Sequence, residues 1–181
     1  MLKIAHRGAS GHILENTKKS FKKALKLNTE GVEFDVRLTK DKRIVVIHDE
    51  DLKRVANNSD LVKDLTLRQI RKIKQKDGED ILTLKEALKI LNHSCVYKIH
   101  LKEKGMEEKV INFIKQRNLE KRIIITTDFF SVARKVKNIC PDLKVELGGI
   151  RKRIKAEKII RRAKNAKADF ISPHHSIILK N

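Results

Sequence analysis

Short apolar runs alternate along this chain with stretches in which apolar residues recur at helical spacing. Leu2–Ala5 and Val32–Leu38 have the length of buried strands, whereas Phe21, Ala24 and Leu25 mark one face of a helix. Such alternation is typical of an α/β fold with a mostly parallel sheet. We predict strands at residues 2–5, 32–38, 44–48, 95–101, 123–126, 144–147 and 170–172, and helices at residues 18–27, 61–76, 84–91, 106–117, 131–139 and 153–166.

Local signals indicate where several of these elements begin and end. Thr17 is predicted to cap the first helix. Gly148-Gly149 is predicted to end the strand at residues 144–147. Residues 39–43 are too few for a crossover helix, so a tight link must join the strands on either side. Capping boxes are predicted at two further helix starts, by Thr66 with Gln69 and by Thr83 with Glu86.

Length and composition favour one soluble globular domain. The chain has 181 residues, of which 36% are charged and 40% apolar. No apolar run approaches the roughly 20 residues that span a bilayer. The first residues have no signal-peptide pattern, so we expect a cytoplasmic protein. The two cysteines, Cys95 and Cys140, are expected to be buried free thiols.

The net charge of +20 would attract the chain to polyanions such as nucleic acid, anionic lipid or phosphorylated substrates. The basic residues are spread along the whole sequence, however, and the basic segment Arg151–Lys155 leads into a helix with an ordinary apolar stripe. Aromatic residues make up only 4% of the chain, which leaves few stacking platforms for single strands. We therefore expect no specific nucleic-acid partner and at most a weak contact with anionic membranes.

Charged and imidazole side chains stand where several apolar runs end. Glu33 and Asp35 are two residues apart on a strand, so both point to the same face. Carboxylate oxygens of this kind bind hard cations. His6, His48 and His100 also lie at or near the ends of predicted strands, where catalytic groups gather in a β/α barrel. These residues are compatible with a metal-assisted phosphodiesterase site.

Each of these features also has an ordinary structural interpretation. A histidine at the end of a strand is more often a hydrogen-bonded loop residue than a catalytic one. Glu33 and Asp35 could pair with lysines, which this chain has in excess. Glu15-Asn16-Thr17 also suits the start of a helix, where a carboxylate faces the positive end of the helix dipole. Spacing alone therefore leaves both interpretations open.

Ordered motifs add a resemblance to a known family. The motifs are Ala5–Gly11, Glu15-Asn16-Thr17, Glu33–Val36, Thr39-Lys40-Asp41 and Val45–Asp49, followed by Leu52, Arg54 and Leu82-Thr83-Leu84. In order and spacing they resemble the glycerophosphodiester phosphodiesterase family, most strongly over residues 2–102. The resemblance implies a single domain over residues 1–181 and a TIM-type (β/α) barrel of the phosphodiesterase and phospholipase C kind. It also implies hydrolysis of glycerophosphodiesters to glycerol 3-phosphate and an alcohol, helped by a divalent metal.

The resemblance also implies roles for individual residues. His6 and His48 become the acid/base pair, because an unperturbed imidazole titrates near neutral pH. Arg7 and Lys102 become cations on the substrate phosphate, whose charge must be neutralised during hydrolysis. Glu33 and Asp35 become metal ligands. Mg²⁺ or Ca²⁺ is the expected cofactor.

Two departures from the family pattern open an alternative. The family carries a third metal-binding glutamate where this chain has His100, and imidazole suits Mn²⁺ or Zn²⁺ better than Ca²⁺. A TIM barrel typically takes about 250 residues, so the last strand-helix units are expected to be missing. A homodimer could then cover the open barrel edge. The alternative is a catalytically impaired relative that still binds phosphate or a lipid headgroup, and the role of His174-His175 stays open.

Overall fold

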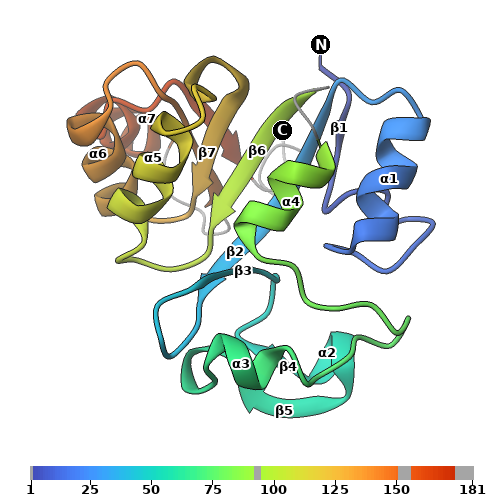
Figure 1. Cartoon of the computed structure of the whole chain (residues 1–181). Coiled ribbons are helices and arrows are strands. Elements are labelled where there is room, and N and C mark those ends of the chain that lie inside the picture. Colours follow the sequence, from blue (N-terminus) through green and yellow to red (C-terminus); the bar gives the residue numbers. More distant parts are fainter. Residues whose placement is uncertain (1, 92–94, 151–155, 174–181) are drawn as a thin grey trace. The chain divides into compact units, whose positions relative to one another are not determined.

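The computed structural model describes residues 2–91, 95–150 and 156–173, which form parts of two compact units, residues 1–100 and 101–181 (Figure 1). His174 and His175 lie outside the described residues. The single domain over residues 1–181 stays a prediction. Cys95 and Cys140 are buried free thiols, as expected. None of the described helices is long and apolar enough to cross a membrane.

The first unit is built on a sheet with the strand order β1-β2-β6. β1 (Ile4–Ala5) runs parallel to β2 (Gly31–Leu38), and β6 (Val96–Leu101) lies on the other side of β2. β3 (Ile44–Val46) pairs with β2 in antiparallel orientation, with Val46 opposite Val36. The short link at residues 39–43 is therefore a tight turn, as predicted. Because β3 runs back along β2, the residues that follow β3 return to the level of Glu33 and Asp35.

The helix starts predicted at Thr17 and Thr83 are confirmed. α1 (Lys18–Lys26) begins at Thr17, whose side chain accepts a hydrogen bond from Ser20 N–H in a capping box. α4 (Leu84–Leu91) begins at Thr83, whose N–H donates to Glu86 Oε2 at 2.8 Å while Glu86 N–H donates back to Thr83 Oγ1. The two helices contact each other. Local sequence thus determined both helix starts.

The segment after β3 differs from the prediction. Instead of one helix over residues 61–76, this segment contains a 3-10 turn at residues 62–64 and a short α-helix, α3, at residues 67–70. The predicted capping box of Thr66 with Gln69 is confirmed, and because Thr66 is extended, the α-helix begins only at Leu67. The apolar residues around it pack onto a core from several short elements, which overrides the helical spacing. These are β4 (Asp51–Leu52), α2 (Lys53–Ala56), β5 (Asn58–Leu61), η1 (Val62–Asp64) and α3 (Leu67–Ile70).

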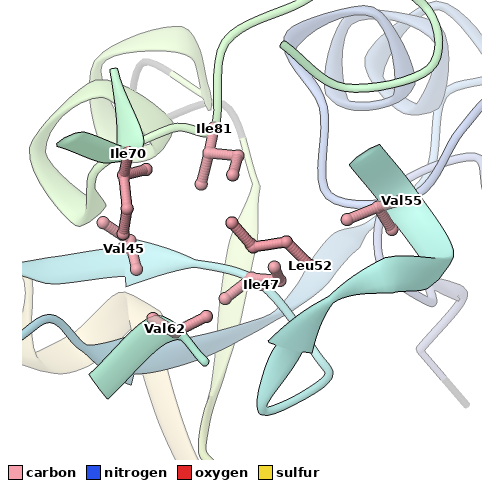
Figure 2. Close-up of a cluster of buried hydrophobic side chains, with 7 residues drawn as sticks. All are labelled: Val45, Ile47, Leu52, Val55, Val62, Ile70 and Ile81. Carbon is pink, nitrogen blue, oxygen red and sulfur yellow. The ribbon is translucent and has the colours of Figure 1, made fainter. Parts of the chain in front are cut away.

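Figure 2 shows the core that joins these short elements. Seven buried side chains form one cluster: Val45, Ile47, Leu52, Val55, Val62, Ile70 and Ile81. Leu52 and Val55 belong to β4 and α2 and point toward Ile47 just beyond β3. Apolar burial of this kind is what holds elements of only two to four residues in place, since such elements have little stability alone.

We expect Leu52→Ala to destabilise the first unit by about 3 kcal/mol, because Leu52 is fully buried and its removal leaves a cavity. Urea unfolding measures the change. Leu27→Ala is the matched control, since Leu27 is 49% exposed and its truncation should change the free energy of unfolding by about 0.5 kcal/mol or less. Equal effects of the two substitutions would contradict the assignment of Leu52 to the core.

The second unit contains three parallel strands, β7 (Ile123–Thr127), β8 (Lys144–Ile150) and β9 (Phe170–Pro173). The described helices of this unit are α5 (Glu107–Lys115), η2 (Glu120–Arg122), α6 (Phe130–Ile139) and α7 (Ala156–Asn165). The predicted strand end at Gly148-Gly149 is wrong: β8 continues to Ile150 through a shift in register. Gly149 permits this with a φ of 64°, and a Cβ there would collide with Asp128.

Asp169 ties three parts of the second unit together. Its carboxylate accepts hydrogen bonds from Val145 N–H at 2.9 Å, Lys137 Nζ at 2.9 Å and Lys144 Nζ at 3.0 Å. Burial alone would raise the pKa of Asp169, but these donors outweigh it and lower the pKa. The ionised form therefore stabilises the folded chain above the ordinary Asp pKa.

We expect Asp169→Asn to lower the free energy of unfolding by about 1–2 kcal/mol at neutral pH. The folded-state pKa is depressed, so the stabilisation is present above the unfolded pKa of about 3.9 and is lost as pH falls through the folded value. Wild type and variant should therefore converge in strong acid. Urea unfolding from neutral to acidic pH tests this, and a difference that stays constant with pH would contradict it.

Candidate active site

The loop between β1 and α1 presents Arg7 in a constrained conformation. Arg7 has a φ of 54° and Asn16 a φ of 57°, a left-handed region that costs a side chain such as arginine about 1 kcal/mol or more. Gly8 follows with a φ of 76°, and a Cβ there would collide with Ser20 and Phe21. The result is that Arg7 N–H donates to Glu33 Oε2 at 2.9 Å while its side chain reaches Glu15 and Asp35.

Glu33 and Asp35 lie on β2 as a buried pair of carboxylates. Their exposed fractions are only 6% and 1%. Asp35 Oδ2 accepts a hydrogen bond from Asn16 Nδ2 at 3.1 Å and lies 3.3 Å from Arg7 Nε. Burial, and next the charge of Asp35, raises the pKa of Glu33 to about 8. Two buried carboxylates side by side are unfavourable unless a positive charge compensates them, so this site favours cations.

His100 on β6 completes a group that could hold a metal ion. Donor atoms of Glu33, Asp35 and His100 all lie within 4.8 Å of one another. His100 Nδ1 is 3.5 Å from Asp35 Oδ1 and 4.0 Å from Glu33 Oε1. Two atoms that bind one ion at roughly 2.1–2.5 Å are at most about 4.2–5 Å apart, so these separations fit one divalent ion. The donor set of two oxygens and one nitrogen also suits Mn²⁺ or Zn²⁺.

His6 stands at the edge of this group. Its Nε2 lies 3.9 Å from Glu33 Oε2, and 68% of its side chain is exposed. Partial burial, and next the charge of Arg7, lowers the pKa of His6. The exposed ring of His6 is therefore accessible to a ligand beside the carboxylates.

His48 is held on two sides just after β3. Its carbonyl oxygen accepts a hydrogen bond from Arg37 Nε at 2.9 Å, and its ring Nδ1 lies 2.6 Å from Asp49 Oδ1. Asp49 Oδ2 lies 2.6 Å from Arg54 Nε. His48, Asp49 and Arg54 also line a surface hollow of about 790 Å³. The histidine therefore combines a fixed ring with access from solvent.

A continuous chain of charged contacts connects His48 with the carboxylate pair. It passes from His48 through Asp49, Arg54, Glu15 and Arg7 to Asp35. Its links include Arg54 Nη2 to Glu15 Oε1 at 2.7 Å and Arg7 Nη1 to Glu15 Oε2 at 3.0 Å. Short charged contacts of this kind favour a defined orientation of the groups that they join.

The structure thus brings together most of the residues that the sequence singled out. Glu33, Asp35, His100, His6 and Arg7 lie in one group, and the charged chain extends this group to His48. Lys102 directly follows β6 in the second unit, and its role stays a prediction. Sequence reasoning assigned no role in the site to the residues that contact these groups, which are Glu15, Asn16, Asp49 and Arg54. These residues belong to the sequence motifs described above, but the contact between Arg54 and Glu15 depends on the tertiary structure, because the two residues are 39 positions apart.

Comparisons with known proteins agree on one family. A model described as "Glycerophosphoryl diester phosphodiesterase family" matches residues 6–178. A glycerophosphodiester phosphodiesterase of Caldanaerobacter subterraneus is 40% identical over 159 residues, a match that covers 81% of this chain and 65% of the relative. The chain thus spans less than two thirds of the length of that curated relative.

Two solved structures show the same fold. A glycerophosphodiester phosphodiesterase of Thermotoga maritima is 28% identical with a TM-score of 0.83, covering 99% of this chain and 76% of that one. An Oleispira antarctica phosphodiesterase, solved with the product sn-glycerol-3-phosphate, is 23% identical with a TM-score of 0.82, covering 96% and 75%. The predicted α/β fold of the TIM-barrel type is confirmed, and this chain corresponds to about three quarters of each solved chain.

Proposed function

Because the chain belongs to the glycerophosphoryl diester phosphodiesterase family, we propose that it hydrolyses glycerophosphodiesters to glycerol 3-phosphate and an alcohol. The observation that carries the proposal is the group of Glu33, Asp35 and His100, which could hold a metal ion, with His6 and Arg7 beside it. Hydrolysis of a phosphodiester requires neutralisation of phosphate charge and two proton transfers, and this group contains the residue types for both.

Glu33, Asp35 and His100 would hold a divalent metal. Mg²⁺ or Ca²⁺ suits the two carboxylates, and Mn²⁺ or Zn²⁺ is the alternative because His100 is an imidazole. When bound, such an ion supplies a Lewis acid next to the phosphate oxygens. The raised pKa of Glu33 and the burial of Asp35 support a cation at this position.

The remaining residues would bind the substrate and move its protons. Arg7, held by Glu15 and Asp35, would orient the phosphate, and Lys102 would supply a second positive charge. His6 and His48 would act as the acid/base pair, one accepting the proton of the nucleophile and the other donating a proton to the leaving alcohol. The phosphoryl oxygens would thus face positively charged groups, and the imidazoles of His6 and His48 would transfer the two protons.

A direct assay tests the proposal. Purified protein is incubated with glycerophosphodiesters in the presence of Mg²⁺, Ca²⁺ or Mn²⁺, and the release of glycerol 3-phosphate is measured. We expect metal-dependent release that chelation abolishes. No turnover above that of a His6→Ala variant would refute the activity.

A catalytically impaired phosphate binder is the second candidate, favoured by His100 at a metal-ligand position. Exchange of a carboxylate for an imidazole removes one negative charge from the site and weakens its hold on hard cations. This candidate predicts binding of glycerol 3-phosphate without turnover. Calorimetry that shows tight binding of a divalent metal, abolished by Asp35→Ala, would count against it.

A homodimer is a further proposal about partners. Phe170 and Ile171 on β9 are 45% and 37% exposed, so two neighbouring apolar side chains of this strand are accessible to water. Their burial between two copies of the chain would remove apolar area from water. Sedimentation equilibrium tests this, with a monomer at every concentration as the contrary outcome.

Weak contact with anionic membranes is proposed from α7. The helix carries Lys158, Arg161 and Arg162, and Ile160 among them is 46% exposed. Basic residues around an exposed apolar one favour anionic lipid surfaces. Cosedimentation with phosphatidylserine vesicles at low salt tests the contact, and equal binding to neutral vesicles would contradict it.

A further inference from the structure

Arg54 occupies a central place in the charged chain, although the proposed chemistry does not require it. Its Nε lies 2.6 Å from Asp49 Oδ2 and its Nη2 lies 2.7 Å from Glu15 Oε1. Glu15 in turn accepts hydrogen bonds from Arg7 Nη1 at 3.1 Å and 3.0 Å. One guanidinium therefore connects the carboxylate beside His48 with the carboxylate that holds Arg7.

Asp49 decides which ring nitrogen of His48 carries a proton. Burial would raise the pKa of Asp49, but the hydrogen bonds from Arg54 and His48 outweigh it and lower the pKa, so the carboxyl is ionised at neutral pH. An ionised carboxylate can only accept hydrogen bonds, and His48 Nδ1 is 2.6 Å from it. Nδ1 must therefore be the protonated nitrogen. Nε2 is then the atom that can accept a proton from a reacting group.

The core cluster determines where Arg54 stands. Arg54 lies in α2, a helix of a single turn. Leu52, just before α2, and Val55, within it, are both buried in that cluster. The Arg54 side chain itself is 46% exposed. Ion pairs at so exposed a site typically contribute little to the stability of a fold. Two short contacts of one planar guanidinium with the carboxylates of Asp49 and Glu15 instead orient these carboxylates, because the N–H groups of a guanidinium point in fixed directions.

We propose that Arg54 is a positioning residue: it holds Asp49 against His48 Nδ1 and Glu15 against Arg7. His48, one of the proposed acid/base pair, and Arg7, a proposed phosphate ligand, would thus keep their orientation through one shared side chain. The catalytic consequence rests on the proposed function, whereas the orientation of His48 can be measured without any substrate. We expect Arg54→Gln to lower kcat by about tenfold to a hundredfold with divalent-metal affinity unchanged.

The protonation of His48 provides the decisive measurement. The chain is labelled with ¹⁵N-histidine, and two-bond ¹⁵N–¹H spectra at about pH 8, where an ordinary imidazole is neutral, distinguish Nδ1–H from Nε2–H. The His48→Gln variant assigns the signal. Wild type should show Nδ1–H, and both Arg54→Gln and Asp49→Ala should lose this preference. Arg68→Gln, which changes an exposed arginine of α3, is the matched control and should retain it.

Chemical rescue separates positioning from general damage to the fold. Arg54→Ala removes the guanidinium from the side of a surface hollow that His48 and Asp49 also line, so a free guanidinium ion can take its place. Low concentrations of guanidinium should restore the His48 spectrum and, in an active chain, kcat. An unchanged spectrum in Arg54→Gln, or no rescue of Arg54→Ala, would overturn the proposal. Rescue of the spectrum in a chain without turnover would support it while refuting the proposed activity.

Discussion

Replacing Asp35 with asparagine is expected to abolish binding of a divalent metal and to lower kcat/KM about a thousandfold, or ~4 kcal/mol. Asp35 is 1% exposed, and its carboxylate lies 3.5 Å from His100 Nδ1 and 3.3 Å from Arg7 Nε. Asparagine keeps the size of the side chain and one oxygen but removes the negative charge. His100 contributes no negative charge, so Glu33 would be the one remaining carboxylate among the three candidate metal ligands of the variant.

Calorimetry with Mn²⁺ and the rate of glycerol 3-phosphate release measure the two effects of Asp35→Asn separately. Asp60→Asn serves as the matched control, since Asp60 is an exposed residue of β5 outside the site. The control should retain wild-type affinity and rate. Wild-type metal affinity in Asp35→Asn would show that the metal binds elsewhere.

Alanine in place of either His6 or His48 is expected to lower kcat by about a hundredfold to ten-thousandfold while leaving metal affinity close to that of wild type. His6 Nε2 lies 3.9 Å from Glu33, and Asp49 orients the His48 ring. Each substitution removes a proton donor or acceptor without removing a carboxylate from the group around Asp35. Loss of rate with retained metal affinity would distinguish these variants from Asp35→Asn.

Single-turnover rates and Mn²⁺ calorimetry check this expectation. His12→Ala is the matched control, because His12 is an exposed histidine in the same loop as His6. We expect full activity from it. Retention of wild-type kcat in His48→Ala would remove His48 from the acid/base pair, and the same outcome for His6→Ala would remove His6.

Sequence alone determined those parts of this protein that depend on neighbouring residues. The capping residues Thr17 and Thr83 start helices as predicted, because an N-cap needs only a side-chain oxygen near the next backbone N–H groups. The pairing of Glu33 with Asp35 on one face follows from the period of a strand. The family motifs also placed His6, Arg7 and His48 among the site residues, although their catalytic roles stay predictions.

Several features could not be determined from sequence because they depend on distant packing. The predicted helix over residues 61–76 is shortened to α3, since the buried cluster takes its apolar side chains from several short elements. β8 passes through Gly148 and Gly149, because its pairing with β9 continues to Ile150. In both cases contacts between segments that are distant in sequence outweigh the local signal.

The candidate site shows the same division. Its residue types could be read from the sequence, but their orientation could not. His100 reaches Asp35 because β6 lies beside β2, and Arg54 reaches Glu15 across 39 positions of the chain because the core cluster anchors α2. Chemical identity is a local property of a sequence. Hydrogen bonds and ion pairs require separations of a few ångströms, and only the tertiary structure brings these groups so close.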